Sequence, residues 1–254
     1  MRRVNAKPRA GTVDETEVAG FAKLAREWWD PDGAFRPLHR LNPARLRFLR
    51  DNLAAHFGRD AKSPRPFQGL TLLDIGCGGG IVAEPMARLG FKVTGIDADP
   101  QAIAVARDHA REAGLTIDYR AAAAEDLARA GRKFDAVMAL EVVEHAADPD
   151  LFLATAASLV RPGGAFGAST LNRTAKAFVV AIVGAEYVMR WLPRGTHRWG
   201  KFVRPSELAG ALRRNGLEIG PVAGLGFDPL RGEWRVGGRP DVNYLLFASK
   251  PTGK

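Results

Sequence analysis

The stretch LLDIGCGGGIVAE, residues 72–84, places four glycines within five positions directly after a short apolar run. Glycine weakens any strand or helix that holds it, because it loses the most conformational entropy on folding. The cluster therefore indicates that something approaches the backbone between Gly76 and Gly80 more closely than a side chain would allow. A glycine-rich turn from a strand into a helix lets a ligand lie against bare backbone at the helix N-terminus. The alternative is a tight structural turn.

Strand and helix patterns alternate along the chain from residue 70 onward. Such an alternation predicts a parallel sheet with helices on both faces. The apolar runs LEIGPVAGLGF and VNYLLFASK near the C-terminus predict two antiparallel strands. The fold class is therefore α/β: a Rossmann-like, doubly wound, mostly parallel sheet with an antiparallel C-terminal strand pair. The parallel strands are expected at residues 70–76, 91–97, 115–123, 133–140 and 165–170.

The region before the glycine cluster has a helical pattern. We expect helices at about residues 14–30 and 42–56, followed by the polar, proline-containing linker GRDAKSPRPFQG. The sequence thus predicts an N-terminal helical extension over residues 1–64 and a main domain over 65–254. An insert at about 172–204 interrupts the main domain.

Composition excludes several classes of protein. The chain has 254 residues, of which 46% are hydrophobic, so it can bury a substantial core. Its single cysteine, Cys77, excludes a disulfide framework and a cysteine-based zinc ribbon. The start MRRVNAKPRAGTVDETE lacks the apolar region of a secretory signal, and there is no run of about 18 apolar residues. These features predict a cytoplasmic protein.

The net charge of +9 is concentrated in three blocks, at residues 1–13, 35–50 and 173–204, and the remainder is net acidic. Solvated arginines on helix faces would explain any one block. Three blocks together favour a basic face, which suits nucleic acid or an anionic membrane surface.

Acidic residues flank the glycine cluster where three expected strands end. Asp74 precedes the cluster, Asp97 ends the second strand, and Glu125 and Asp126 follow the third. A carboxylate after the second strand is a usual partner of ribose hydroxyls. The acidic rim favours a nucleoside that carries positive charge, such as S-adenosylmethionine, over a diphosphate.

The glycine spacing supports the same ligand. The order G-x-G-G-G departs from the G-x-G-x-x-G of dinucleotide sites, because Ile81 follows the cluster. An NAD-linked oxidoreductase is therefore disfavoured. We expect the cofactor to approach the backbone at Gly76 and Gly78.

Two sets of motifs carry a resemblance to known proteins. The segments LLDIGCGGG, TGID and LVRPGGAFGAST, in this order, resemble the class I S-adenosylmethionine-dependent methyltransferases over about residues 70–170. A narrower resemblance, over about residues 14–250, is to the ubiquinone-biosynthesis O-methyltransferase family. It is carried by REWWDPDGAFRPLHRLNPARL, EVVEHAADP, STLNRTAKAF, GAEYVMRWLPRGTHRWGKF and DVNYLLF.

The resemblance implies methyl transfer from S-adenosylmethionine to a phenolic oxygen of polyprenylated catechol intermediates, at two steps of the pathway. Carried over residue by residue, it implies cofactor contacts from Arg45, Gly76, Asp97 and Leu140. Some members of the family have methionine at the position of Leu140, where either side chain would form an apolar wall. Association with other enzymes of ubiquinone biosynthesis is a further possible consequence.

The motif EVVEH follows the fourth expected strand. On a helical turn, Glu141, Glu144 and His145 share one face. They could bind a divalent cation, with magnesium preferred over zinc, and lower the pKa of a catechol. Alternatively, His145 alone is the general base, or the motif is only the polar start of a helix. The resemblance favours catalysis by all three as metal ligands.

Other functions remain as rivals. A methyltransferase acting on nucleic-acid bases is disfavoured, since ALEVVEH stands where the N/D-P-P-Y/F element of exocyclic-amine methyltransferases would be, and we expect no nucleic-acid partner. A methyltransferase of another phenolic or lipid substrate, or a non-catalytic membrane-surface module that binds the cofactor, is the alternative.

The insert has the pattern of an amphipathic helix from about Thr174 to Leu192. Its apolar stripes are bordered by lysine and arginine, and Glu186 and Arg190 interrupt it too soon for it to span a bilayer. It suits a position at the headgroup boundary of an anionic membrane, which predicts a peripheral protein at the inner face of the membrane. The alternative is a lid over the active site.

Overall fold

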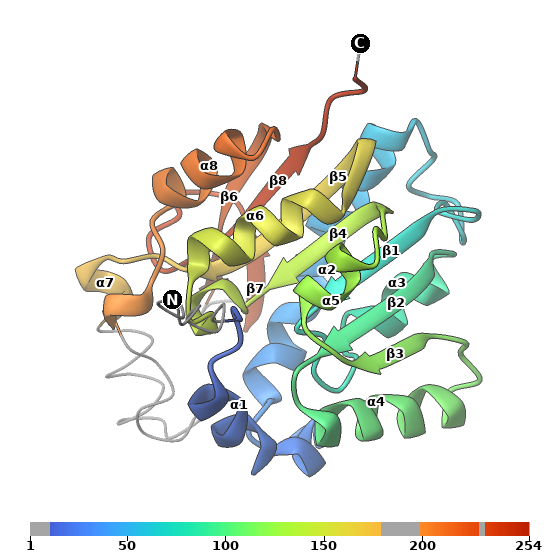
Figure 1. Ribbon diagram of the computed structural model, residues 1–254. Helices are drawn as coiled ribbons and strands as arrows, with labels where there is room; N and C mark the ends of the chain where they lie inside the picture. The colour runs from blue at the N-terminus through green and yellow to red at the C-terminus, as the bar shows by residue number, and fades with distance from the viewer. Residues whose placement is uncertain (1–10, 179–198, 229–231, 254) are drawn as a thin grey trace, which may run out of the picture.

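The computed structural model describes residues 11–178, 199–228 and 232–253, and its helices cover both faces of one large sheet (Figure 1). The strands are β1 (Thr71–Ile75), β2 (Lys92–Asp97), β3 (Asp118–Ala121), β4 (Phe134–Leu140), β5 (Val160–Leu171), β6 (Glu218–Asp228), β7 (Glu233–Val236) and β8 (Asn243–Ser249). The helices are α1 (Glu15–Ala22), α2 (Arg36–Phe57), α3 (Ala83–Arg88), α4 (Pro100–Glu112), α5 (Ala124–Arg129), α6 (Pro149–Leu159), α7 (Ala175–Ala177) and α8 (Pro205–Arg214). The 3₁₀ turns are η1 (Ala25–Glu27), η2 (Val143–His145) and η4 (Trp199–Lys201).

The sheet has eight strands in the order β3-β2-β1-β4-β5-β8-β6-β7. The first five are parallel, and β8, β6 and β7 join them in antiparallel pairs. The α/β fold class is thus confirmed. The chain reverses its direction of winding between β1 and β4, which is the switch point where ligands bind in such sheets.

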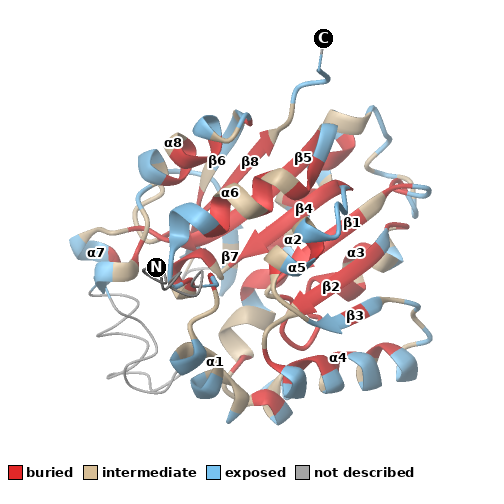
Figure 2. Cartoon of the chain, viewed as in Figure 1, coloured by how far each residue is buried: buried red, intermediate tan, exposed pale blue. Residues whose placement is uncertain are grey.

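The strands at the centre of the sheet are largely buried (Figure 2). Successive side chains of a strand point to opposite faces of the sheet, so the core has two layers. Leu73 belongs to a cluster with residues of α5, α6 and α8, whereas its neighbour Leu72 belongs to a cluster with α2, α3 and α4. Leu49 and Leu53 of α2 are fully buried in the second cluster. The predicted extension therefore shares the core of the main domain, and a boundary at residue 64 stays a prediction.

Two expected helices differ from the structure. The first ends at Ala22 rather than near residue 30, and the turn η1 follows it. The second begins at Arg36 rather than at Asn42, whose side chain does not cap a helix but donates to the carbonyl of Ile81. The chain breaks between the helices because Trp28 and Trp29 pack onto the glycine cluster, a tertiary contact that local periodicity does not reveal.

The C-terminal region contains β7, an edge strand that the sequence did not indicate, beside the two expected strands. At the insert, the Thr174 hydroxyl accepts a hydrogen bond from the amide of Ala177, as expected of an N-cap. The rest of the predicted helix, from residue 179 to 192, lies outside the described residues. Across the described residues, no helix has the length and apolarity that crossing a bilayer demands.

Candidate active site

A cavity of about 250 Å³ lies at the carboxyl ends of the parallel strands. Its walls come from the glycine turn after β1, the end of β2, the segment after β4, and helix α1 with the chain that precedes it. Most of the lining is apolar, and a few charged side chains interrupt it. This combination is typical of a small-molecule site.

The glycine cluster accommodates the protein's own side chains. A Cβ atom at Gly78 would lie 2.3 Å from the ring of Trp28, and one at Gly79 would lie 2.5 Å from the same side chain. Gly76 has φ +69°, and a Cβ atom there would lie 2.8 Å from Val142. Gly76 lines the cavity, whereas Gly78 lies beneath Trp28. The two glycines predicted to contact the cofactor therefore have different surroundings.

Asp97 connects the end of β2 to the glycine turn. Its Oδ2 accepts a hydrogen bond of 2.9 Å from the amide of Gly78, and its Oδ1 accepts one of 2.9 Å from the amide of Asp99. Burial raises the pKa of Asp97, against the opposing effect of these backbone hydrogen bonds. Asp97 lines the cavity, in the position expected of a carboxylate that binds ribose hydroxyls.

Asp74 and Arg45 place opposite charges in the same cavity. Asp74 is 2% exposed, and its Oδ2 is buried without a hydrogen-bond partner in the part of the chain that the structure describes. Burial raises the pKa of Asp74 to about 7, although the charge of Arg45 opposes the shift. Arg45, itself buried, donates two hydrogen bonds to Oδ1 of Asn42. An unsatisfied buried carboxylate beside a guanidinium fits the ammonium and carboxylate groups of S-adenosylmethionine.

Leu140, at the end of β4, lines the cavity as an apolar wall. The structure does not bring Glu125 and Asp126 to the cavity. Glu125 Oε1 accepts a hydrogen bond of 2.8 Å from the amide of Thr12, and Asp126 caps α5 and pairs with Arg129. Their place after β3 suggested cofactor contacts, but the N-cap geometry of α5 turns Asp126 outward.

The EVVEH motif forms the sharp turn after β4. Glu141 has φ 54°, the only positive value at a non-glycine residue in the described chain. Such a conformation is strained for a residue with a side chain, and strain of this kind gathers at functional sites. The Glu141 carboxylate accepts hydrogen bonds from Ser169 Oγ at 2.6 Å and from Asn243 Nδ2 at 3.1 Å.

Glu144 and His145 continue the turn as part of η2. Glu144 is 3% exposed and accepts a hydrogen bond of 2.8 Å from Thr170. Burial, and after it the charge of Glu141, raises the pKa of Glu144 to about 8. His145 points the other way, with Nδ1 3.1 Å from Oε2 of Glu17 in α1. Burial alone would raise the pKa of Glu17, but a hydrogen bond from Lys201 and the charge of His145 lower it.

The predicted metal set of Glu141, Glu144 and His145 fits a magnesium ion in part. Within residues 11–178, 199–228 and 232–253, no three His, Cys, Asp or Glu side chains are grouped so that they could hold a metal ion. The two carboxylates are oxygen donors of the kind that magnesium prefers. Asn243, which donates to Glu141, has a buried Oδ1 with no partner among the described residues. His145 would have to leave Glu17 to join them.

Several site residues escaped the reasoning from sequence. In the sequence, Asp14 and Glu17 look like ordinary acidic residues at the start of a helix. Lys201 looks like one of many charges in a basic block. Trp28 has the pattern of a core aromatic residue. Trp28, Lys201 and Asn243 did carry one signal, because each lies in a segment that contributes to the family resemblance: REWWDPDGAFRPLHRLNPARL, GAEYVMRWLPRGTHRWGKF and DVNYLLF.

Solved structures share this fold. The magnesium protoporphyrin IX methyltransferase of Synechocystis PCC 6803, solved with bound SAH, matches with a TM-score of 0.65 and 20% identity, over 93% of this chain and 100% of that chain. A Thermotoga maritima S-adenosylmethionine-dependent methyltransferase matches with a TM-score of 0.61 and 18% identity, over 91% and 98%. At these identities the likeness shows the fold alone.

Sequence relatives are much more similar. A family model described as a methyltransferase domain matches residues 39–221. The ubiquinone biosynthesis O-methyltransferase of Azorhizobium caulinodans is 57% identical over 92% of this chain and 93% of its own length. The protein of the same name from Cereibacter sphaeroides is 53% identical over 94% and 98%. The chain therefore belongs to the methyltransferase domain family and, within it, to the ubiquinone biosynthesis O-methyltransferases.

Proposed function

We propose that the protein is an S-adenosylmethionine-dependent O-methyltransferase that methylates the phenolic hydroxyl of polyprenylated catechol intermediates, at both O-methylation steps of ubiquinone biosynthesis. Relatives that carry this name are 52–57% identical over nearly the whole chain. The observation that carries the proposal is Oδ2 of Asp74, which has no hydrogen-bond partner among the described residues and lies near Arg45, in a cavity that Glu141, Glu144 and His145 also line. Cofactor-binding charges and groups able to act on a phenol thus share one cavity.

Different residues of the cavity would have different roles in methyl transfer. S-adenosylmethionine supplies an electrophilic methyl group when bound. Asp74 and Arg45 would hold its amino and carboxyl groups, and Asp97 its ribose. By holding the cofactor in one orientation, these three residues would contribute to the alignment of the reacting groups, and such alignment is a large part of catalysis.

A phenol has a pKa of about 10, so its proton has to leave before or during attack. His145 would accept this proton, since it lines the cavity and its Nδ1 is held by Glu17. Glu141 and Glu144 would hold a magnesium ion, which supplies Lewis acidity toward a catechol oxygen.

Turnover with a short-chain catechol analogue tests this function. Full-length protein with S-adenosylmethionine should produce the methyl ether, and excess EDTA should abolish turnover until magnesium is restored. Magnesium should also raise the melting temperature of the wild type, but not of Glu144→Gln, because that variant lacks one of the two ligand carboxylates. Full activity and an unchanged melting temperature in EDTA would remove the metal from the proposal and leave His145 alone to deprotonate the phenol.

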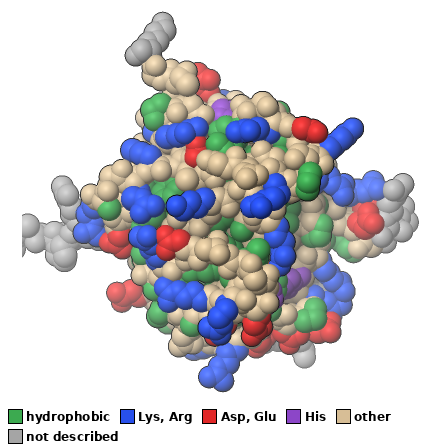
Figure 3. Space-filling model, turned by 90° about the vertical axis from the view of Figure 1, so that its right-hand side faces the viewer, with side chains coloured by type: hydrophobic (Ala, Val, Ile, Leu, Met, Phe, Trp, Pro, Cys, Tyr) green, Lys and Arg blue, Asp and Glu red, His purple; other side chains and the backbone are tan. Residues whose placement is uncertain are grey.

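We also propose that the protein acts at the inner face of the membrane as a peripheral protein. An isoprenoid tail partitions into the bilayer, since each CH₂ group favours the apolar phase by ~0.8 kcal/mol. The insert combines apolar residues with Lys176, Arg190 and Arg194, which suit anionic headgroups. Lysine and arginine side chains are spread over the face of the molecule seen in Figure 3, in keeping with the net charge of +9.

Flotation with liposomes tests the membrane proposal. The protein should float with vesicles that contain anionic lipid and float less as salt rises, because the attraction is electrostatic and therefore screened. Deletion of residues 174–194 should abolish flotation, and Arg190→Gln with Arg194→Gln should weaken it. If the deletion variant still binds S-adenosylmethionine and floats as well as the wild type, the insert is not the membrane element.

A further inference from the structure

Asp99 is a buried carboxylate at the wall of the cavity, just beyond Asp97 in the chain. It is 3% exposed, and it lines the cavity at the end of β2. Its Oδ1 accepts a hydrogen bond of 2.8 Å from the amide of Gln101 and so caps helix α4. Its Oδ2 is also buried and has no hydrogen-bond partner in the described part of the chain. One oxygen of the carboxylate therefore has a structural task, and the other has none.

Capping a helix does not require a buried carboxylate. The same Ala-Asp-Pro sequence stands at the start of α6, where Oδ1 of Asp148 accepts a hydrogen bond of 3.0 Å from the amide of Leu151. Asp148 is exposed, so water can hydrate its other oxygen. A buried carboxylate oxygen loses this hydration, which costs free energy unless another partner replaces it. The cap therefore explains Oδ1 of Asp99 but not the burial of its Oδ2.

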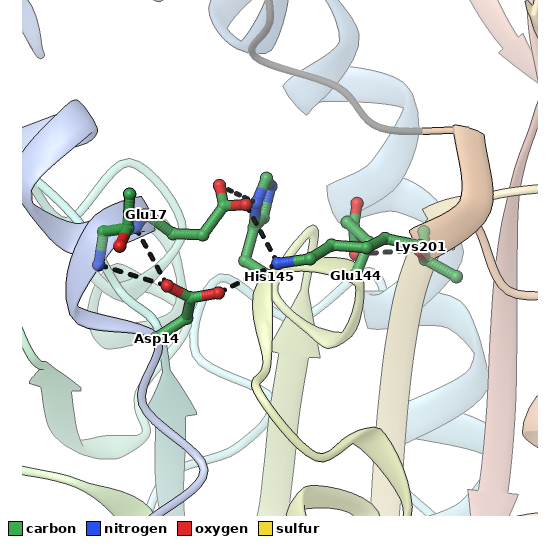
Figure 4. A network of polar contacts seen from close by, with 7 residues as sticks. Asp14, Glu17, Glu144, His145 and Lys201 are labelled. Atoms are coloured by element: carbon green, nitrogen blue, oxygen red, sulfur yellow. Dashed lines mark hydrogen bonds and ion pairs between the residues drawn. The ribbon is translucent and has the colours of Figure 1, made fainter.

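Most other carboxylates of the cavity have partners within the protein. Figure 4 shows one such group, in which Glu17 accepts a hydrogen bond of 3.0 Å from Nζ of Lys201. Among the residues that the structure describes, only Asp74 and Asp99 combine a place in the cavity wall with a buried carboxylate oxygen that lacks a partner. The proposed function already assigns Asp74 to the amino-acid end of the cofactor. Asp99 has no assigned partner.

The neighbouring Asp97 indicates which ligand group would satisfy Asp99. Oδ1 of Asp97 accepts a hydrogen bond of 2.9 Å from the amide of Asp99, and Oδ2 accepts one of 2.9 Å from the amide of Gly78. Part of the hydrogen-bonding capacity of Asp97 is thus used by the backbone. A ribose carries two neighbouring hydroxyl groups, and each can donate to a carboxylate. Two carboxylates at the end of β2 match such a pair of donors.

The two carboxylates also interact electrostatically. Burial, and after it the charge of Asp99, raises the pKa of Asp97, while hydrogen bonds from backbone amides oppose the shift. A hydroxyl group that donates to the pair would relieve this repulsion, because its hydrogen carries partial positive charge. A phosphate on the ribose would increase the repulsion instead. The pair therefore favours a ribose without phosphate.

We propose that Oδ2 of Asp99 accepts a hydrogen bond from a ribose hydroxyl of S-adenosylmethionine, which makes Asp99 a second ribose-binding carboxylate beside Asp97. The inference rests on the proposed function only in taking S-adenosylmethionine as the ligand. Asp99 then contributes to the affinity for the cofactor and not to the chemical step, because the ribose does not react.

Removal of single hydroxyl groups from the ligand tests this contact. Calorimetry compares S-adenosylhomocysteine with its 2′-deoxy and 3′-deoxy analogues, for the full-length wild type and for Asp99→Ser. Serine retains an oxygen that can cap α4, but it lacks the second carboxylate oxygen. Asp99→Ser should bind S-adenosylhomocysteine about 10–150-fold more weakly, the scale of a lost hydrogen bond to a charged group.

The deoxy analogues decide whether the lost partner is the ribose. One of them should bind the wild type and Asp99→Ser with nearly equal affinity, because the hydroxyl that Asp99 would bind is already absent. If Asp99→Ser weakens both analogues by the same factor as S-adenosylhomocysteine, or weakens none of the three ligands, Asp99 does not bind a ribose hydroxyl.

Asp148→Ser is the matched control, since it makes the same change in the same local sequence at an exposed cap. It should leave the affinity for all three ligands unchanged, and the melting temperatures of the two variants report the contribution of each cap. A loss of affinity in Asp148→Ser equal to that in Asp99→Ser would show that a weakened cap, and not a lost ligand contact, causes the effect.

Methylthioadenosine locates the contact along the cofactor, since it has the nucleoside of S-adenosylhomocysteine but neither its amino nor its carboxyl group. Asp99→Ser should weaken both ligands by the same factor, whereas Asp74→Asn should weaken only S-adenosylhomocysteine. A loss in Asp99→Ser that is confined to S-adenosylhomocysteine would place Asp99 at the amino-acid end and overturn the proposal. If the wild type binds these ligands but does not methylate a catechol, the proposed function fails, and the binding data still decide the role of Asp99.

Discussion

Replacement of His145 by alanine should lower kcat for methylation of a catechol by about 10²–10⁴-fold, the scale of a lost general base. The phenol would then have to lose its proton to water. The affinity for S-adenosylmethionine should stay near the wild-type value, because the residues that we propose to hold the cofactor are Asp74, Arg45, Asp97 and Asp99. Single-turnover transfer of a labelled methyl group measures the chemical step, and calorimetry measures the affinity.

The control for this variant is His56→Ala. His56 lies away from the cavity, where its Nε2 is 3.0 Å from the carbonyl of Gly163 near the start of β5. It should change the melting temperature more than kcat. If His145→Ala retained the wild-type single-turnover rate with bound cofactor, another group would be taking the proton, and the assignment of His145 would be wrong.

Replacement of Asp97 by alanine should weaken the binding of S-adenosylmethionine by ~1.5–3 kcal/mol, the scale of a lost hydrogen bond to a charged group. This corresponds to an increase in Kd of about 10–150-fold, measured by calorimetry. The change also removes the acceptor for the amides of Gly78 and Asp99, which would loosen the glycine turn. Both effects act on affinity, so kcat at saturating cofactor should fall much less.

Two comparisons refine the Asp97 result. Asp97→Asn keeps an oxygen acceptor and should lose less affinity than the alanine variant. Asp118→Asn, which alters an exposed carboxylate on β3 that pairs with Arg120, should bind S-adenosylmethionine like the wild type. Unchanged affinity for S-adenosylmethionine in Asp97→Ala, together with tighter binding of NAD, would overturn the assignment of the cofactor site.

The fold could be predicted because its signals are local. The strands β1, β2 and β4 contain apolar runs, and helical patterns alternate with the strands, so the order of elements is present in the sequence. Asp74, Asp97 and the EVVEH motif could be placed in one region for the same reason. They follow the ends of parallel strands, and those ends meet at one edge of the sheet.

Other features depended on contacts that cross the fold. The glycine cluster predicts a close approach to its backbone, but only the tertiary structure identifies Trp28 as the side chain that approaches Gly78 and Gly79. The first helix ends early for the same reason, since Trp28 and Trp29 leave the helical path to reach this turn.

The sequence alone determined the fold class, the family and the region of the site, because strand and helix patterns and the motifs at strand ends are properties of neighbouring residues. The tertiary structure decided which groups surround the reactive side chains. Glu17 is 128 positions from His145 and 184 from Lys201, and Asn243 is 102 from Glu141. No periodicity connects residues so far apart; folding of the sheet brings them together, and their hydrogen bonds then determine where each charge and proton lies.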